Sequence, residues 1–328
     1  MNNEYEESIK KEFEAVEGIS VEATEEKTTD LGSVDPNRMK RVTADDPEIR
    51  RIQELTGYIR LDLNLLPSAG LYYRHDLEIH IRAARVGEIR NFSTIDETNP
   101  KDVDDKLNSI LASCTKVKYG NQHGSYKDIL EEDRVYIILS IRELTFKDGE
   151  AKLMMPVNKK NCFSSTCKKE ESVELKVKNL LFQKVDSSIE KYYNEENRCY
   201  SIQTKNYGII DMAPPTIGVM RALTDYARDK ENNNSNWDKS LLAILPYLQR
   251  EWRGLDEKAI FSIMVDLQGW DVSKFSLVYR IAEMMRIGIE SEMVNECNTC
   301  GAEVTVPLTF PGGIKSLFII QNIDSQLL

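Results

Sequence analysis

The chain has 328 residues, of which 41% are hydrophobic and 30% charged, and its formal net charge is −11. A chain of this length buries at least one full hydrophobic core and has room for two. No apolar run is long enough to cross a bilayer, and the acidic amino terminus lacks the basic and apolar segments of a signal peptide. We therefore expect a protein made and kept in a cytoplasm.

The negative charge is concentrated at the amino terminus. Residues 1–35 hold eleven Asp and Glu residues and three Lys, which leaves a net charge of −3 for the remaining 293 residues. Affinity for nucleic acid comes mainly from Lys and Arg side chains that pair with phosphates. A nearly neutral body with an acidic leader therefore argues against DNA or RNA binding.

The first 45 residues lack periodic apolar spacing and are rich in Glu, Thr and Asp. This composition is typical of a disordered arm, because too little apolar surface is available to offset the entropy of ordering. Ile9, Phe13 and Val16 fall on one face of a helical pattern, so a short docking helix is the alternative to a solvated tail.

A pair of strands is predicted after the arm. Apolar and polar residues alternate from Ile59 to Leu65 and again from Leu77 to Ile81, as in strands that are buried on one face. Pro67-Ser68-Ala69-Gly70 between them has the composition of a turn. The segment is therefore predicted to form a β-hairpin or two strands joined by an ordered loop.

Helical periodicity dominates the rest of the chain. An apolar stripe predicts a helix from Pro100 that places Cys114 in the core, and the stretch from Tyr126 to Phe146 predicts a long, largely buried helix. After a polar stretch at 179–210, four more helices are predicted. They begin near Pro214, Trp237, Asp256 and Asp271.

The two halves of the chain follow a similar order. Segments 79–92 and 209–223 each pass from strand-like residues into the start of a helix, and each is followed by more helices and a cysteine pair. The predicted fold class is α+β and mainly helical, with two pseudo-repeated lobes, each with a β-hairpin and a helix bundle, joined by a four-cysteine zinc-ribbon-like module. The expected domains are an acidic arm (1–45), an N-terminal lobe ending in the first cysteine pair (46–178), an insertion or linker (179–210) and a C-terminal lobe ending in the second pair (211–328).

Four of the six cysteines form two pairs, Cys162 with Cys167 and Cys297 with Cys300. In a reducing compartment, paired cysteines favour a metal over a disulfide. Four thiolates complete the tetrahedral shell of one structural zinc ion, and Gly301 relieves the backbone where its amides approach the sulfurs. Thiols without metal, a disulfide, or two separate arrangements remain as alternatives.

The 129 residues between Cys167 and Cys297 do not argue against a shared ion. Closing so long a loop costs about 2 kcal/mol more than closing one of about twelve residues, because the entropic penalty rises with the logarithm of length. Structural zinc contributes on the order of 10–16 kcal/mol in zinc-finger peptides. The free energy of zinc binding therefore outweighs the cost of closing the loop.

The sequence predicts no catalytic residues. His75, His80 and His123 lie far from the cysteines and are predicted to be surface histidines and not ligands. Glycine-rich phosphate cradles, HExxH, GxSxG and paired-carboxylate signatures are absent from the sequence. Four cysteine ligands leave no open position on the metal. Zinc is thus the one predicted cofactor, no small-molecule substrate is expected, and an enzyme built from scattered Asp, Glu and His is the least favoured hypothesis.

Residues 66–94, LPSAGLYYRHDLEIHIRAARVGEIRNFST, resemble the T-even-type bacteriophage baseplate protein family of tail baseplate hub components and assembly factors. Members of that family show an LPSxGxxY hairpin, a second strand leading to a helix, an Asp-rich helix ending near a cysteine, a long apolar helix and a later CxxCG. The likeness covers about residues 58–312. This chain departs from the family pattern in having CxxxxC as its first pair, an acidic arm and the additional stretch 179–210.

The resemblance implies a structural or assembly protein of a contractile-tailed phage baseplate, either a hub component or a hub assembly chaperone, which acts through protein–protein surfaces. The implied partners are other phage tail and baseplate proteins, and the implied location is the virion tail baseplate, assembled in the host bacterial cytoplasm. No membrane or nucleic-acid partner is expected. The alternative is a zinc-ribbon adaptor that acts on nucleic acid or the transcription machinery, which requires a basic face that the composition disfavours.

Overall fold

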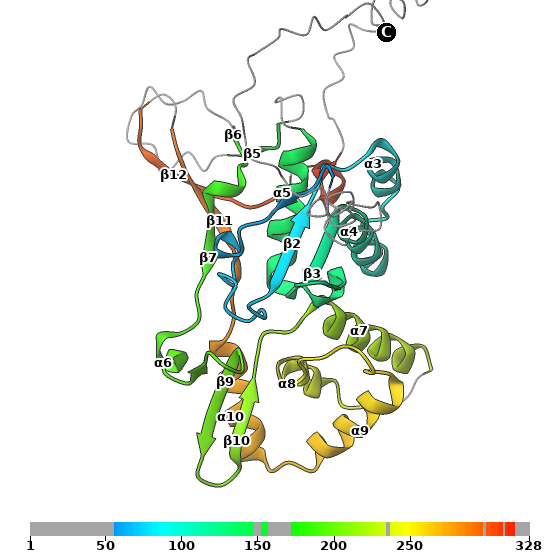
Figure 1. Cartoon of the computed structure of the whole chain (residues 1–328), viewed down its shortest axis with the longest axis vertical. Coiled ribbons are helices and arrows are strands. Elements are labelled where there is room, and N and C mark those ends of the chain that lie inside the picture. Colours follow the sequence, from blue (N-terminus) through cyan, green and yellow to red (C-terminus); the bar gives the residue numbers. More distant parts are fainter. Residues whose placement is uncertain are drawn as a thin grey trace, which may run out of the picture. The chain divides into compact units, whose positions relative to one another are not determined.

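A computed structural model describes residues 56–146, 152–156, 172–233, 237–297, 300–310 and 312–318 (Figure 1). These residues belong to one compact unit, Leu55–Leu328. The acidic arm expected at 1–45 lies outside the described residues. The described part combines helices with antiparallel sheets, which confirms the predicted α+β class. No helix in this part is long and apolar enough to span a bilayer.

The first sheet has four antiparallel strands in the order β1-β2-β3-β4. The second predicted strand is confirmed as β2, and its apolar side chains are buried. The strand expected from Ile59 to Leu65 is confirmed only at its first two residues. The Asp62 side chain accepts a hydrogen bond from the Asn64 amide at 3.0 Å, and a 3-10 helix forms at Leu63–Leu65. The strands are β1 (Ile59–Arg60), β2 (Leu77–Ile81), β3 (Thr115–Tyr119) and β4 (Gln122–His123).

Two helices, α3 (Val86–Ser93) and α4 (Pro100–Cys114), pack against each other beside this sheet (Figure 1). Helix α4 begins at Pro100 as predicted, because the Asn99 side chain accepts hydrogen bonds from the first exposed amides of the helix. Cys114 is fully buried at the other end of the helix, which confirms its predicted place in the core.

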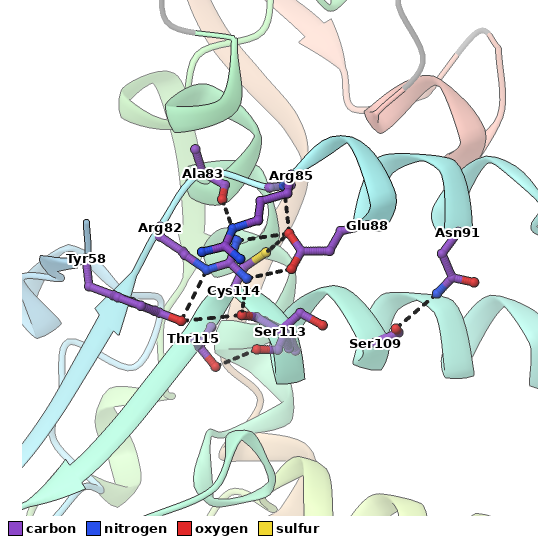
Figure 2. A network of polar contacts seen from close by, with 12 residues as sticks. Tyr58, Arg82, Ala83, Arg85, Glu88, Asn91, Ser109, Ser113, Cys114 and Thr115 are labelled. Atoms are coloured by element: carbon purple, nitrogen blue, oxygen red, sulfur yellow. Dashed lines mark hydrogen bonds and ion pairs between the residues drawn. The ribbon is translucent and has the colours of Figure 1, made fainter. Parts of the chain in front are cut away.

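Arg82, directly after β2, ties the sheet to both helices (Figure 2). Its guanidinium donates to the two carboxylate oxygens of Glu88 on α3 at 2.5 and 2.9 Å, and to the carbonyl oxygen of Ser113 on α4 at 2.7 Å. This pairing lowers the pKa of Glu88 to about 2. Burial, aided by the Glu88 charge, raises the pKa of the Cys114 thiol to about 12. The ion pair is therefore charged at neutral pH and the thiol is not.

The helix predicted from Tyr126 to Phe146 is shorter in the structure. Helix α5 covers Arg134–Thr145, and the residues before it form 3-10 helices at Tyr126–Asp128 and Glu131–Asp133. Between these two turns, Leu130 is extended and forms an isolated bridge with Thr216. A tertiary contact therefore interrupts the helical pattern that the sequence predicts.

The turn Pro67–Gly70 is fixed to the start of α5 by Asp133, whose carboxylate is fully buried. This carboxylate accepts hydrogen bonds from the Ser68 amide at 2.9 Å, the Ser68 hydroxyl at 2.6 Å and the Tyr73 hydroxyl at 2.7 Å. The Tyr73 hydroxyl in turn accepts one from the Leu130 amide at 2.9 Å. Burial raises the pKa of both Asp133 and Tyr73. The turn is therefore an ordered part of the core.

The range 179–210, expected as an insertion or linker, contributes strands to two further sheets. Strand β7 (Leu180–Gln183) lies against β11 (Gly288–Glu296), which also pairs with β12 (Glu303–Pro307). Strand β9 is the middle strand of a sheet with the order β10-β9-β8, and β5 and β6 form a separate antiparallel pair. The remaining elements of this part are β5 (Met154–Pro156), β6 (Ser172–Glu174), a 3-10 helix at Val177–Asn179, α6 (Ser187–Glu190), β8 (Tyr193–Asn194), β9 (Cys199–Thr204) and β10 (Gly208–Met212).

Three of the four helices predicted after Pro214 are confirmed, and each is capped by the side chain that precedes it. They are α7 (Ile217–Asn232) after Thr216, α9 (Glu257–Gln268) after Asp256 and α10 (Val272–Met284) after Asp271. A final 3-10 helix spans Ile314–Leu317.

The prediction of one helix beginning near Trp237 is wrong. This stretch forms a 3-10 helix at Lys239–Ala243 and the short helix α8 (Leu245–Leu248). Pro246 cannot donate the amide hydrogen bond of a helix interior. Trp252 packs instead on Gly218 of α7, where an added Cβ would come within 2.4 Å of its ring.

Candidate metal centre

Cys297 and Cys300 lie in the turn that joins β11 to β12. The hairpin register ends at the pair Glu296 and Glu303, and the Cys297 amide then donates to the carbonyl oxygen of Ala302 at 2.9 Å. The Gly301 amide donates to the carbonyl oxygen of Cys297 at 2.8 Å. These two bonds fold the CxxCG segment back on itself, so that both cysteines belong to one tight turn.

Gly301 has the backbone conformation that the sequence analysis expects after the second cysteine. Its φ angle is 67°, in the left-handed region where a side chain is disfavoured, and no atom lies within 4 Å of the position of an added Cβ. The requirement for glycine is therefore one of backbone conformation and not of space.

The two cysteines of this turn differ in exposure. Cys297 is buried, whereas Cys300 is exposed. A metal held by both cysteines would therefore lie close to the protein surface.

Cys162 and Cys167 lie outside the described residues. In sequence they fall within 157–171, between β5 and β6, which pair antiparallel with Met155 opposite Val173. Strand β5 packs against β12. The hairpin that carries the second cysteine pair therefore lies beside the strands that flank the first pair, at one end of the unit (Figure 1).

A cleft of about 710 Å³ opens between these two pairs of strands. One part of its lining carries Lys152, Lys176 and Lys178, and another part carries Glu296 and Glu303. Glu174 also lines it, 3.7 Å from the Lys152 ammonium and 3.5 Å from that of Lys176. The cleft therefore carries charges of both signs in similar number and does not form a basic surface.

Within the described residues, no three His, Cys, Asp or Glu side chains form a group that could hold a metal ion. Two of the four predicted ligands are among these residues, and they share one turn. The fit of the site to zinc therefore depends on the donor chemistry of Cys297 and Cys300 and on the neighbouring position of β5 and β6.

The remaining candidate ligands lie elsewhere. Cys114 and Cys199 are fully buried, in α4 and β9. His75 and His123 are exposed, as the sequence analysis predicts. His80 was expected at the surface and is instead buried on β2, with its Nε2 atom 3.7 Å from a carboxylate oxygen of Glu78. Residues on both faces of β2 are buried here, so the alternation of apolar and polar residues wrongly predicted an exposed position for His80.

Two polar groups in the described part were not identified from the sequence. The buried carboxylate of Asp133 had one available signal, an acidic residue that directly precedes a long apolar run. Arg198, which lines a cleft, had no such signal in the sequence. Its position depends on a left-handed backbone conformation with a φ angle of 53°. Comparisons with known proteins add no assignment, since no family model, curated protein or solved structure matches the chain.

Proposed function

We propose that the chain is a structural or assembly protein of a contractile-tailed bacteriophage baseplate, acting as a hub component or hub assembly chaperone through protein–protein surfaces. The observation that supports a docking role is the exposure of large apolar side chains on α9 and at the start of α10. Phe261 and Val265 are 57% and 51% exposed, and Val272 is 81% exposed. Exposed apolar side chains of this size, when they gather on one face, are typical of protein interfaces.

Helix α9 is apolar on two faces. Ile260, Met264 and Leu267 are buried and hold the helix on the core. Phe261 and Val265, four residues apart, share another face and are each more than half exposed. An outer apolar face costs solubility unless a partner covers it, which supports a role in assembly.

The segment that carries the resemblance to baseplate proteins is also compatible with this role. Its turn, Pro67–Gly70, is held by Asp133 through the buried Ser68, so the exposed Ala69 that follows has a fixed position. The proposal includes the finer architecture, with two pseudo-repeated lobes, each with a hairpin and helices, joined by a four-cysteine module. Superposition of residues 79–146 on residues 209–285 tests this repeat.

One structural zinc ion held by Cys162, Cys167, Cys297 and Cys300 belongs to the same proposal. Support comes from the packing of β5 against β12, because the two connections that carry the cysteines leave neighbouring strands. Four thiolate ligands would cross-link the two hairpins and leave no open position for a substrate. We therefore propose a protein that is cross-linked by zinc, binds other proteins through its surfaces and has no catalytic residues.

The proposed partners are other tail and baseplate proteins, and the proposed location is the virion tail baseplate after assembly in the bacterial cytoplasm. The test is co-expression of the full-length tagged chain with hub and wedge proteins of a contractile-tailed phage, followed by affinity purification. We expect at least one hub or wedge protein to be retained. A folded chain that retains none of these proteins would contradict the proposal.

A pair of variants tests the apolar face in the same experiment. Phe261→Ser removes an exposed ring from α9, and Val86→Ser removes a side chain that is 66% exposed at the start of α3. We expect Phe261→Ser to reduce the retained partner and Val86→Ser to leave it unchanged. Equal retention by both variants would show that α9 does not form the contact.

A further inference from the structure

A second cleft, of about 580 Å³, lies beside the Pro67–Gly70 turn and shares no lining residue with the cleft at the cysteine hairpins. Its volume is in the range of sites that bind small ligands or peptide side chains. Aliphatic side chains, three arginines and a histidine line it, with one carboxylate. They are Leu61, Leu63, Leu71 and Leu77, then Arg60, Arg74, His75 and Arg198, and Asp62.

The backbone of this cleft is strained at two places. Ala69 and Arg198, with φ angles of 49° and 53°, are the only non-glycine residues of the described chain with positive φ, and both line this cleft. The left-handed conformation is unfavourable for such residues, because their Cβ atom approaches the following carbonyl oxygen. Strain of this kind gathers at ligand sites, where the surrounding structure holds it in place.

Arg198 reaches the cleft from the turn between β8 and β9. One of its terminal nitrogens donates to the carbonyl oxygen of Leu71 at 3.2 Å, and the other lies against the His75 ring, 2.9 Å from Nε2. Its Nε atom is buried and has no hydrogen-bond partner. A carbonyl oxygen and an imidazole ring orient the guanidinium, and neither carries the negative charge of a carboxylate.

The other arginines of the cleft are already paired. Arg60 lies 3.3 Å from a carboxylate oxygen of Glu78, and Arg74 lies 2.9 Å from one of Asp76. No described Asp or Glu forms an ion pair with Arg198. Arg198 is therefore a cation held in place without an ion-pair partner among the described residues, in a cleft that is also lined by leucines and by Asp62.

We propose that this cleft binds an acidic peptide segment of a partner protein, with a carboxylate on the Arg198 guanidinium and an aliphatic side chain between Leu63 and Leu71. A guanidinium binds a carboxylate through two parallel hydrogen bonds. Leu71 is 44% exposed, so an aliphatic side chain gains contact there that a small anion does not. The site goes beyond the proposed baseplate role and does not depend on the zinc ion.

The test is fluorescence anisotropy with the full-length protein and fluorescein-labelled peptides. One peptide alternates glutamate with leucine, and its charge-reversed counterpart alternates lysine with leucine. A labelled single-stranded oligonucleotide of thymidines serves as the nucleic-acid arm. We expect the Glu-Leu peptide to bind tightest of the three. Equal or tighter binding of the Lys-Leu peptide or the oligonucleotide, or no binding of the Glu-Leu peptide, would overturn the proposal.

Two variants locate the binding in the cleft. Arg198→Asn keeps a residue that tolerates positive φ and removes the charge, and we expect it to weaken the Glu-Leu peptide on the order of tenfold, as for loss of a hydrogen bond between charged groups. Leu71→Ser removes an exposed aliphatic side chain and should weaken binding severalfold. Arg280→Asn, an exposed arginine on α10 outside the cleft, is the control and should leave affinity unchanged. Equal loss in Arg198→Asn and Arg280→Asn would show that only net charge matters and would refute the site.

Discussion

Replacement of Asp133 by alanine tests the buried network that holds the Pro67–Gly70 turn. The substitution leaves three donors without their acceptor, namely the Ser68 amide, the Ser68 hydroxyl and the Tyr73 hydroxyl, which now lie 2.6–2.9 Å from the carboxylate. Each buried donor left without a partner costs about 1–3 kcal/mol, less where a water molecule enters the space. We expect the free energy of unfolding of Asp133→Ala to fall by about 3–5 kcal/mol.

Two variants that remove fewer hydrogen bonds should lower the free energy of unfolding by smaller amounts. Ser68→Ala removes the hydroxyl that donates to Asp133 and that accepts a hydrogen bond from the Gly70 amide at 3.2 Å. Asp133 keeps its other two hydrogen bonds, so the expected loss is about 1–2 kcal/mol. Tyr73→Phe removes one bond to Asp133 and also leaves the Leu130 amide without its acceptor, so the expected loss is about 2 kcal/mol. Urea unfolding at pH 8, followed by tryptophan fluorescence and circular dichroism, measures all three. A loss below about 1 kcal/mol for Asp133→Ala, or a loss for Ser68→Ala as large as that for Asp133→Ala, would refute the reasoning.

Three further predictions concern pH and packing. Burial raises the pKa of Glu132 to about 7, so the folded state favours the protonated carboxyl group. As the pH rises from about 4.5 to 7, we expect the free energy of unfolding to fall by about 2–3 kcal/mol. Glu132→Gln should remove this fall, as measured by urea titrations at several pH values. The pKa of Glu88 is lowered to about 2, so its effect on stability has the opposite pH dependence. Ionised Glu88 stabilises the folded state above pH 4.5, and this stabilisation is lost as the pH falls toward 2. Glu88→Gln should therefore reduce the fall in the free energy of unfolding at acid pH by about 2–3 kcal/mol. Gly218→Ala places a Cβ 2.4 Å from the Trp252 ring and should cost about 1–3 kcal/mol with a shift in tryptophan emission, whereas Gly87→Ala, with no atom within 4 Å, should stabilise by about 0.5 kcal/mol. Comparable destabilisation in the two alanine variants would show that the close approach of Trp252 is not the cause.

Local signals in the sequence predicted the elements whose ends are set by neighbouring residues. Helices α4, α9 and α10 begin where Asn99, Asp256 and Asp271 provide caps, because a cap needs only residues two or three positions away. The tight turn at Gly301 was likewise predictable, since a glycine after CxxC marks a backbone that needs positive φ.

The failures fall where distant residues decide the conformation. The helical pattern before α5 is broken because Leu130 bridges to Thr216, and the pattern before α9 is broken where Trp252 packs on Gly218. Left-handed backbone at Arg198 is a third case, because propensity assigns that conformation to Gly or Asn.

The central claim is that one zinc ion links the two cysteine-bearing connections. Its most direct test is the metal content of the full-length protein, purified without chelator and measured by inductively coupled plasma mass spectrometry, together with Cys167→Ser, Cys297→Ser and the control Cys199→Ser, whose sulfur lies buried in β9. We predict one zinc per chain in the native protein and in Cys199→Ser, and a large loss in each of the other two variants. Absence of zinc from the native protein, or its full retention in Cys297→Ser, would contradict the claim.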